Sequence, residues 1–280
     1  MSLPGTGLST ARPVIGVFDS GFGGLTVLKA LVRQMPGARF AFLGDTARLP
    51  YGSKSRRTIA RYAAESAQFL VNQQGAEFLV IACNTASALA LDAIEDAVDV
   101  PVLGVIQPGA QAAAAHSATG DVLVIATEAT IASHAYAAAC HARGLRAVEK
   151  ACPLLVPLVE EGWIDHPVTE QVARIYLEEL LEDALQAGRA PDALVLGCTH
   201  YPLLRPLLER AVPVGVAVID SAEATAAEAA RLLLGSGTMM AGNAPEIRCF
   251  ATDSVEKFER LGSRFLGLPV GPVQLVDLGG

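Results

Sequence analysis

The sequence predicts an α/β protein that contains two similar units, each built on an open parallel sheet. Short apolar, β-branched runs alternate with amphipathic stretches along most of the 280 residues, as they do in repeated strand–helix–strand units. Two of these runs end in the same way, with a cysteine followed by small polar residues, at Cys83 and Cys198. The spacing supports a duplication, because 64 positions separate Asp19 from Cys83 and 71 separate Thr127 from Cys198.

The predicted elements follow one another closely. In the first unit, β-branched and aromatic runs predict strands over 14–18, 39–43, 78–82 and 102–105, and the stretches between them predict helices over 25–34, 55–74 and 87–98. Ser55 is a suitable N-cap for the second of these helices. The second unit has predicted strands over 122–126, 147–150 and 194–196 and helices over 131–143 and 168–186. The remaining strands, over 216–219 and 247–250, and helices, over 223–234 and 254–265, are expected to extend one sheet.

Composition and charge limit the classes of function. Hydrophobic residues make up 51% of the chain, which is enough for two cores. No apolar stretch approaches the roughly 20 residues of a membrane span, and the chain does not begin with a basic segment and an apolar run, so we expect a cytoplasmic protein without membrane association. A net charge of −8 without a basic run argues against nucleic acid as the primary ligand. An odd number of cysteines, five, indicates reduced thiols.

A glycine-rich turn follows the first predicted strand, at Asp19-Ser20-Gly21-Phe22-Gly23-Gly24. Closely spaced glycines allow a ligand to approach the backbone, and the N–H groups at the start of the next helix favour an anion, either phosphate or carboxylate. A dinucleotide-binding fingerprint is incomplete because Thr26 occupies the place of its last glycine, so a small carboxylate is the better candidate. A tight turn alone would explain the glycines but not Asp19 and Ser20.

A second turn follows the next predicted strand and contains Pro50, Tyr51, Gly52 and Ser53. It combines a rigid backbone with hydroxyl groups and free amides. The turn is an adequate connection between a strand and a helix. It also lies at the same edge of the predicted sheet as Ser20, where its amides could hold a second polar group of a ligand.

Cys83 and Cys198 each lie between the end of a predicted strand and the start of a helix. The N–H groups and dipole of a helix start stabilise a thiolate, so we expect a lowered pKa for each thiol and a role as a base near neutral pH. If the two units share a fold, the two thiols could face one substrate from opposite sides. The other three cysteines are expected to be buried apolar residues: Cys140, Cys152 and Cys249.

Two other kinds of site use a cysteine and a histidine. Cys198 and His200 could bind zinc, but the pair of closely spaced cysteines usual in such sites is missing. A cysteine hydrolase with Cys198 as nucleophile and His200 as base would leave Cys83 without a role.

Four motifs in order resemble those of the glutamate racemases, a branch of the aspartate/glutamate racemase superfamily. They are Asp19-Ser20-Gly21-x-Gly23-Gly24-Leu25, Gly44-Asp45-x-x-x-x-Pro50-Tyr51-Gly52, Ala82-Cys83-Asn84-Thr85-Ala86 and Gly197-Cys198-Thr199-His200-Tyr201-Pro202-Leu203. The resemblance covers most of the chain. It implies the interconversion of L-glutamate and D-glutamate, without a metal or another cofactor, to supply D-glutamate for peptidoglycan.

The resemblance also implies roles for individual residues. Cys83 would take the α-proton from D-glutamate and Cys198 from L-glutamate. Asp19 would support Cys83, whereas His200 and Glu160 would support Cys198. Substrate-binding residues would be Asp19, Ser20, Pro50, Tyr51, Gly52, Asn84, Thr85, Thr127, Thr130, Thr199 and His200.

The domain organisation implied by the resemblance has two α/β domains related by a pseudo-twofold axis, with the active site in the cleft between them. Residues 13–106 and 220–280 would form the first domain and 107–219 the second, after a disordered tail over 1–12. A homodimer is expected. The alternatives are a racemase of aspartate or another small amino acid, and a non-catalytic regulatory protein that binds glutamate.

Overall fold

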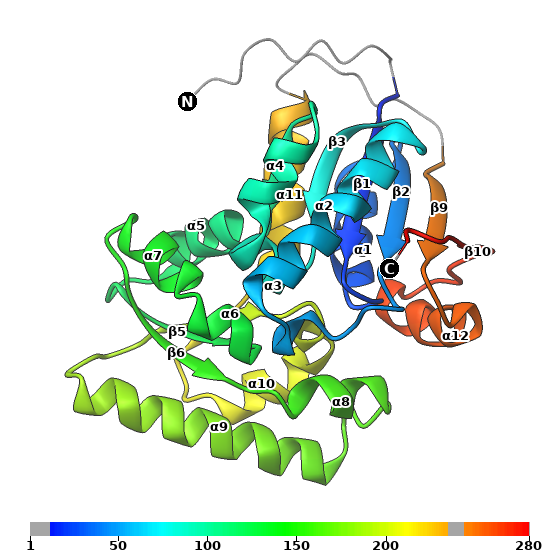
Figure 1. Cartoon of the computed structure of the whole chain (residues 1–280). Helices are drawn as coiled ribbons and strands as arrows, with labels where there is room; N and C mark the ends of the chain where they lie inside the picture. Colours follow the sequence, from blue (N-terminus) through cyan, green and yellow to red (C-terminus); the bar gives the residue numbers. More distant parts are fainter. Residues whose placement is uncertain (1–11, 235–243, 280) are drawn as a thin grey trace.

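The computed structural model describes residues 12–234 and 244–279, whose strands form two sheets with only parallel pairings. The predicted α/β class is confirmed. Figure 1 shows one sheet, with β1, β2, β3 and β9, beside the unit that contains β5 and β6. Of the tail predicted over 1–12, only Arg12 lies within the described residues, and its Nε donates a hydrogen bond to the Gly37 carbonyl at 2.9 Å.

Within the described ranges, the larger sheet has six strands in the order β10-β9-β2-β1-β3-β4. They are β1 (Val14–Asp19), β2 (Arg39–Gly44), β3 (Ala76–Ile81), β4 (Val102–Gly104), β9 (Glu246–Ala251) and β10 (Val273–Leu275). The smaller sheet has four described strands in the order β6-β5-β7-β8. They are β5 (Asp121–Ala126), β6 (Arg146–Ala151), β7 (Ala193–Gly197) and β8 (Ala217–Asp220).

The two sheets repeat one arrangement. The order β4-β3-β1-β2 in the larger sheet matches β8-β7-β5-β6 in the smaller one, so β3 corresponds to β7. Cys83 follows β3 with one residue between, and Cys198 follows β7 directly. The duplication predicted from the sequence is therefore confirmed, and both cysteines stand at the carboxyl ends of equivalent strands.

Helices connect the strands in both units (Figure 1). They are α1 (Leu25–Gln34), η1 (Tyr51–Ser53), α2 (Arg56–Asn72), α3 (Asn84–Leu89), α4 (Leu91–Ala97), α5 (Ile106–His116), α6 (Glu128–Ala132), α7 (Ala135–His141), α8 (Leu155–Glu160), α9 (Pro167–Gln186), η2 (Tyr201–Leu204), α10 (Arg205–Ala211), α11 (Ser221–Leu234) and α12 (Val255–Leu266). The predicted cap of α2 is present, since Ser55 accepts a hydrogen bond from the Thr58 N–H.

Several predicted elements were wrong in detail. The helices expected over 87–98 and 131–143 are each divided, because Ala90 (φ −137°, ψ 5°) and His134 (φ 53°) leave the helical conformation. Elements not predicted are β10, α5, α8, α10 and the short 3₁₀ helices η1 and η2. The late strands do not extend one sheet, since β8 pairs with β7 and β9 pairs with β2. Sheet neighbours are set by long-range packing, which the local sequence does not show.

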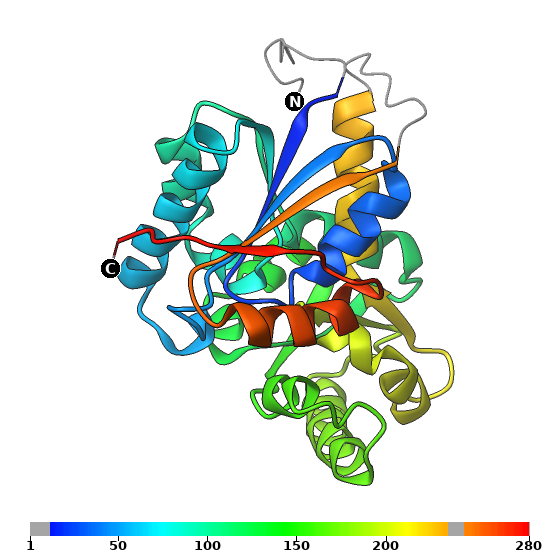
Figure 2. The same ribbon diagram turned by 90° about the vertical axis from the view of Figure 1, so that its right-hand side faces the viewer.

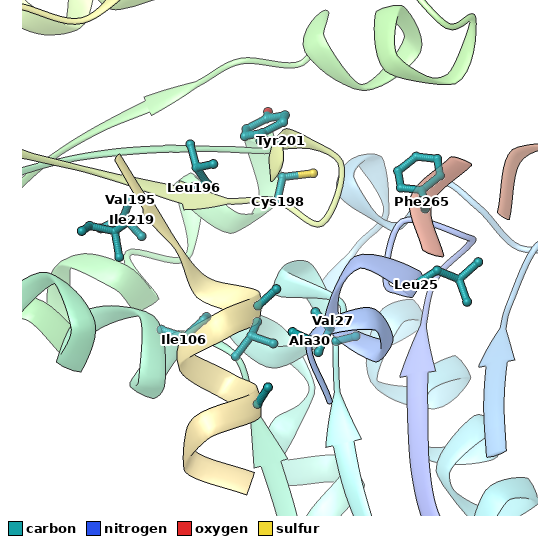
Figure 3. Close-up of a cluster of buried hydrophobic side chains, with 14 of the residues drawn as sticks. Leu25, Val27, Ala30, Ile106, Val195, Leu196, Cys198, Tyr201, Ile219 and Phe265 are labelled. Carbon is teal, nitrogen blue, oxygen red and sulfur yellow. The ribbon is translucent and has the colours of Figure 1, made fainter. Parts of the chain in front are cut away.

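Of the two clusters of buried hydrophobic side chains among the described residues, one spans both units. Helix α1 buries most of its side chains, including Val27 and Ala30, and packs against α11, which follows β8 of the smaller sheet. Figure 2 shows α11 beside α1, next to the larger sheet. Figure 3 shows Val27 and Ala30 in one cluster with Ile219 of β8, and Cys198 lies at the end of β7 nearby. Apolar packing between the units thus positions the strand ends that carry the site.

None of the helices in the described part of the chain is long and apolar enough to cross a membrane.

Candidate active site

The carboxyl ends of equivalent strands from both sheets border a cavity of about 240 Å³. Ser20 reaches it after β1, Cys83 after β3, Thr127 after β5 and Cys198 after β7. The size suits a compact metabolite better than a large cofactor. The two cysteines therefore share one cavity, as the two similar strand ends in the sequence suggested.

Most residues singled out in the sequence line this cavity. They are Ser20, Pro50, Tyr51, Gly52, Cys83, Asn84, Thr85, Thr127, Glu160, Cys198, Thr199 and His200. Asp19 and Thr130 are almost fully buried behind the lining. Further lining residues, none of them assigned a role from the sequence, include Phe22, Leu49, Ser53, Glu128, Pro153, Val156 and Pro157. Phe22 lies inside the first motif, and Ser53 lies in the turn at the end of the second. Pro153 to Pro157 lie at the start of α8, where two prolines obscure any helical pattern.

Cys83 is the N-cap residue of α3 and is 5% exposed. Its thiol donates to Ser20 Oγ, and its sulfur accepts from the Ala86 N–H, each at 3.4 Å. Burial, together with the carboxyl group of Asp19, raises the pKa of Cys83 to about 12. The expectation of a lowered pKa is therefore wrong for this residue, because burial outweighs the hydrogen bonds at the start of a short helix.

Asp19 ends β1 beside Cys83. Its Oδ2 accepts the Gly21 N–H at 3.0 Å, whereas Oδ1 has no hydrogen-bond partner among the described residues. Burial raises the pKa of Asp19 against the opposing influence of His200. Gly24 is required here, because a Cβ at this position would lie 2.5 Å from Asp19 Cβ.

Gly23 has a different reason to be glycine. A Cβ at this position would lie 2.4 Å from Thr199 Oγ1 and 2.7 Å from His200 Nδ1. The glycine-rich turn of the first unit therefore lets the segment after β7 of the second unit approach closely. This close approach brings the two cysteine-bearing strand ends to one site.

Cys198 is supported by a chain of polar groups. Its sulfur lies 3.8 Å from His200 Nδ1, and His200 Nε2 lies 3.3 Å from Glu160 Oε1. Burial by itself lowers the pKa of His200, but its interactions with Cys198 and Glu160 together raise that pKa to about 10. His200 is thus an imidazolium near neutral pH, and both ring nitrogens can donate.

Glu160, at the end of α8, completes this chain. Its Oε2 lies 3.5 Å from Lys257 Nζ of α12, which belongs to the larger-sheet unit. Burial tends to raise the pKa of Glu160, but His200 and Lys257 outweigh it and lower that pKa. The neighbouring Glu161 is exposed and does not line the cavity.

Polar groups suited to an amino acid lie in or directly behind the lining of the cavity that holds the two cysteines. The hydroxyls of Thr85, Thr127 and Thr130 are mutually within 3.0 to 3.2 Å, which joins α3 of one unit to α6 of the other. Asn84 Nδ2 is buried and has no partner among the residues that the structure describes.

A buried ionic cluster, not singled out from the sequence, holds the loop that carries Tyr51. The Tyr51 hydroxyl donates to Asp45 Oδ2 at 2.5 Å, and Arg48 Nε lies 2.8 Å from the same oxygen. Arg48 also pairs with Glu65, and Thr252 donates to Asp45 Oδ1 at 2.9 Å. Asp45 and Arg48 belong to the Gly44 to Gly52 motif, but they do not line the cavity and stabilise the loop instead.

The model of the Asp/Glu/hydantoin racemase family matches residues 15–229. A protein named glutamate racemase from Koribacter versatilis is 57% identical to this chain, and the match covers 98% of this chain and 100% of the relative. The structure of a Bacillus anthracis glutamate racemase has a TM-score of 0.89 and 38% identity over 96% of this chain and 99% of that one. A Francisella tularensis glutamate racemase, solved in complex with D-glutamate, has a TM-score of 0.85 and 36% identity over the same shares of the two chains.

Proposed function

The chain belongs to the Asp/Glu/hydantoin racemase family, and we propose that it interconverts L-glutamate and D-glutamate by acid/base catalysis with two cysteines and no cofactor. The observation that carries the proposal is the placement of Cys83 and Cys198 at equivalent strand ends around one cavity. The activity named for the similar proteins from Koribacter versatilis and Bacillus anthracis supports glutamate as the substrate.

The reaction removes the α-proton from one face of Cα and returns a proton to the opposite face. With L-glutamate, a thiolate at Cys198 takes the α-proton, and the thiol of Cys83 gives its proton to the opposite face of the carbanion. Cys198 is then a thiol and Cys83 a thiolate, and D-glutamate reacts in the reverse sense. Proton transfer of this kind contributes about 10² to 10⁴ to the rate.

The surroundings of the two cysteines favour different protonation states of their thiols. Burial and Asp19 favour a protonated Cys83, which suits its part as the acid toward L-glutamate. His200 can donate to a thiolate at Cys198 through Nδ1, while Nε2 donates to Glu160. The substrate's carboxylate and ammonium groups would be held by polar groups of the lining: Ser20, Tyr51, Gly52, Asn84, Thr85, Thr127 and Thr199. Pro50 would contribute packing, and Thr130 would orient Thr85 and Thr127 from behind.

The direct test is hydrogen exchange at Cα in deuterated water with purified protein and no added cofactor. We expect deuterium in both enantiomers of glutamate and a circular dichroism signal that decays to zero from either side. Aspartate and alanine serve as comparison substrates. Absence of exchange with glutamate would refute the proposed activity, and tight glutamate binding without exchange would support a regulatory binding protein instead.

Substitution of each cysteine tests the mechanism. Cys83→Ser and Cys198→Ser should each lower the racemisation rate by at least about a hundredfold, because serine is a far weaker acid and base in this pH range. Cys249→Ser, in a buried strand away from the cavity, is the matched control and should retain activity. A near-normal rate in either of the first two variants would remove the two-base mechanism.

We further propose that the chain acts in the cytoplasm as a homodimer and supplies D-glutamate for peptidoglycan. The five free cysteines suit a reducing compartment. Residues 13–106 with 220–280, and 107–219, would form the two domains, each with one sheet and one of the two cysteines. Rescue of a bacterium that requires D-glutamate tests the role in the cell, and sedimentation tests the dimer.

A further inference from the structure

Tyr136 of α7 reaches from the smaller-sheet unit to the residue that follows Cys83 in the other unit. Its hydroxyl donates to Asn84 Oδ1 at 2.7 Å. Both side chains are buried, with Tyr136 0% and Asn84 3% exposed. Tyr136 does not line the cavity, whereas Asn84 does. The bond therefore connects the interior of one unit to a polar group at the site on the other.

This hydrogen bond determines the orientation of the Asn84 amide, because it places Oδ1 toward Tyr136. Burial raises the pKa of Tyr136, so its hydroxyl keeps its proton near neutral pH and can make the donation to Oδ1 that the structure shows. A donor opposite the amide selects the carbonyl oxygen Oδ1, which leaves Nδ2 on the other side. Nδ2 is buried without a partner among the described residues, and leaving such a donor unsatisfied is unfavourable. The amide is thus set to donate to an acceptor in the cavity, such as a carboxylate oxygen.

The ring of Tyr136 is itself held in place by close packing. A Cβ at Gly197, just before Cys198, would lie 2.9 Å from Tyr136 Cε2, and a Cβ at Gly109 would lie 3.3 Å from Cε1. These two glycines admit the ring between α5 and the end of β7. The hydroxyl therefore has a position defined by the strand that carries the second cysteine.

A second hydroxyl makes the reciprocal connection. The hydroxyl of Thr26 of α1, in the larger-sheet unit, is shared between two carbonyls: that of Thr199, the residue after Cys198, at 3.0 Å and that of Gly23 at 2.9 Å. In each unit, a hydroxyl thus forms a hydrogen bond to the residue that follows the other unit's cysteine. Only the contact from Tyr136 reaches a side chain with a free donor, so it is the one that bears on ligand binding.

We propose that Tyr136 is a positioning residue for the reaction: its hydroxyl holds the Asn84 amide so that Nδ2 donates to an oxygen of the substrate's carboxylate. The inference rests on the proposed function, because it takes glutamate as the substrate. It assigns to Tyr136 an effect on binding that depends entirely on Asn84.

The test is a double-mutant cycle with Tyr136→Phe and Asn84→Ala. Tyr136→Phe keeps the ring and removes only the hydroxyl, and we expect KM for both enantiomers to rise about tenfold with a much smaller change in kcat. In the Asn84→Ala background, Tyr136→Phe should change KM by less than about twofold. Tyr176→Phe, which removes a hydroxyl 3.4 Å from the Leu154 N–H outside the cavity, is the control and should leave KM unchanged.

A binding measurement without turnover distinguishes failure of this inference from failure of the proposed function. Calorimetric titration of D-glutamate into the Cys83→Ser protein, with and without Tyr136→Phe, should show the same tenfold loss of affinity. Unchanged KM in an active Tyr136→Phe enzyme would overturn the inference alone, as would an equal effect with and without Asn84. A wild-type protein that neither racemises nor binds glutamate would overturn the proposed function and this inference together. A general packing defect would lower the unfolding temperature and kcat and persist in the Asn84→Ala background, which also overturns the inference.

Discussion

Glu160→Gln is expected to change the ionisation of His200 and, through it, the pH dependence of the reaction. Gln keeps the shape and a hydrogen-bond acceptor but removes the negative charge 3.3 Å from His200 Nε2. Loss of an adjacent opposite charge should lower the pKa of His200 by about one to three from its value of about 10. Removal of the charge also leaves Lys257 without its carboxylate partner.

The magnitude follows from the pKa of His200 in the folded protein. A rise from 6.5 to about 10 corresponds to roughly 5 kcal/mol, an upper limit in order of magnitude, of preference for the imidazolium in the folded state. Because the folded pKa is the higher one, this stabilisation is fully present below about pH 6.5 and is lost as the pH rises through about 10. Glu160 contributes to this stabilisation only while its carboxylate is ionised, and its folded pKa lies below the usual 4.5. Glu160→Gln should therefore destabilise the protein most between about pH 4.5 and 6.5 and least above about pH 10, and its effect should also shrink as the pH falls below the lowered pKa of Glu160.

Two measurements check this prediction. NMR titration of the His200 ring, assigned with His200→Asn, gives the pKa directly, and the alkaline limb of kcat for L-glutamate should move to lower pH by the same amount. The exposed neighbour Glu161 provides the matched control, since Glu161→Gln should change neither the titration nor the rate profile. An unchanged His200 pKa in the Glu160→Gln protein would refute the assignment of this pair.

Three further predictions concern contacts around the site. Gly23→Ala places a Cβ 2.4 Å from Thr199 Oγ1, so we expect kcat/KM to fall about a hundredfold in a folded protein; a near-normal value would show that the segment after β7 can move aside. Thr26→Val removes the hydroxyl that bonds the Thr199 carbonyl and should lower kcat/KM about threefold, measured by circular dichroism of glutamate. Tyr51→Phe removes a hydrogen bond to the buried Asp45 carboxylate and should lower the free energy of unfolding in urea by about 1.5 to 3 kcal/mol; a change below about 0.5 kcal/mol would contradict it.

The sequence predicted most of the strands and the shared cavity well because these features follow from local patterns, whereas the sheet to which each late strand belongs did not follow from them. Helix α1 was predicted with both ends correct, since its apolar residues keep one face and the glycine turn marks its start. The cavity could be predicted because residues at the carboxyl ends of parallel strands meet at one edge. That rule and the internal duplication were enough to predict that Cys83 and Cys198 lie at one site.

The features that the sequence did not predict depend on contacts between distant segments. The raised pKa of Cys83 comes from burial next to Asp19, which a helix-dipole argument from neighbouring residues omits. The interaction of Lys257 with Glu160 spans 97 positions. Tyr136 offers no local signal either, because its role depends on Asn84 from the other unit.

The two halves of the site are equivalent in backbone but opposite in charge. Cys83 has the buried carboxyl group of Asp19 behind it, whereas Cys198 has the cationic His200 beside it. This asymmetry cannot favour one enantiomer at equilibrium, because L-glutamate and D-glutamate have equal free energies in water and kcat/KM must be equal in the two directions. The asymmetry can only make kcat and KM differ between the two enantiomers by the same factor, so that kcat/KM stays equal for the two. The enantiomer that binds more weakly must therefore turn over proportionally faster, and variants that change the charge beside one cysteine should alter both constants for each enantiomer while the two ratios stay equal.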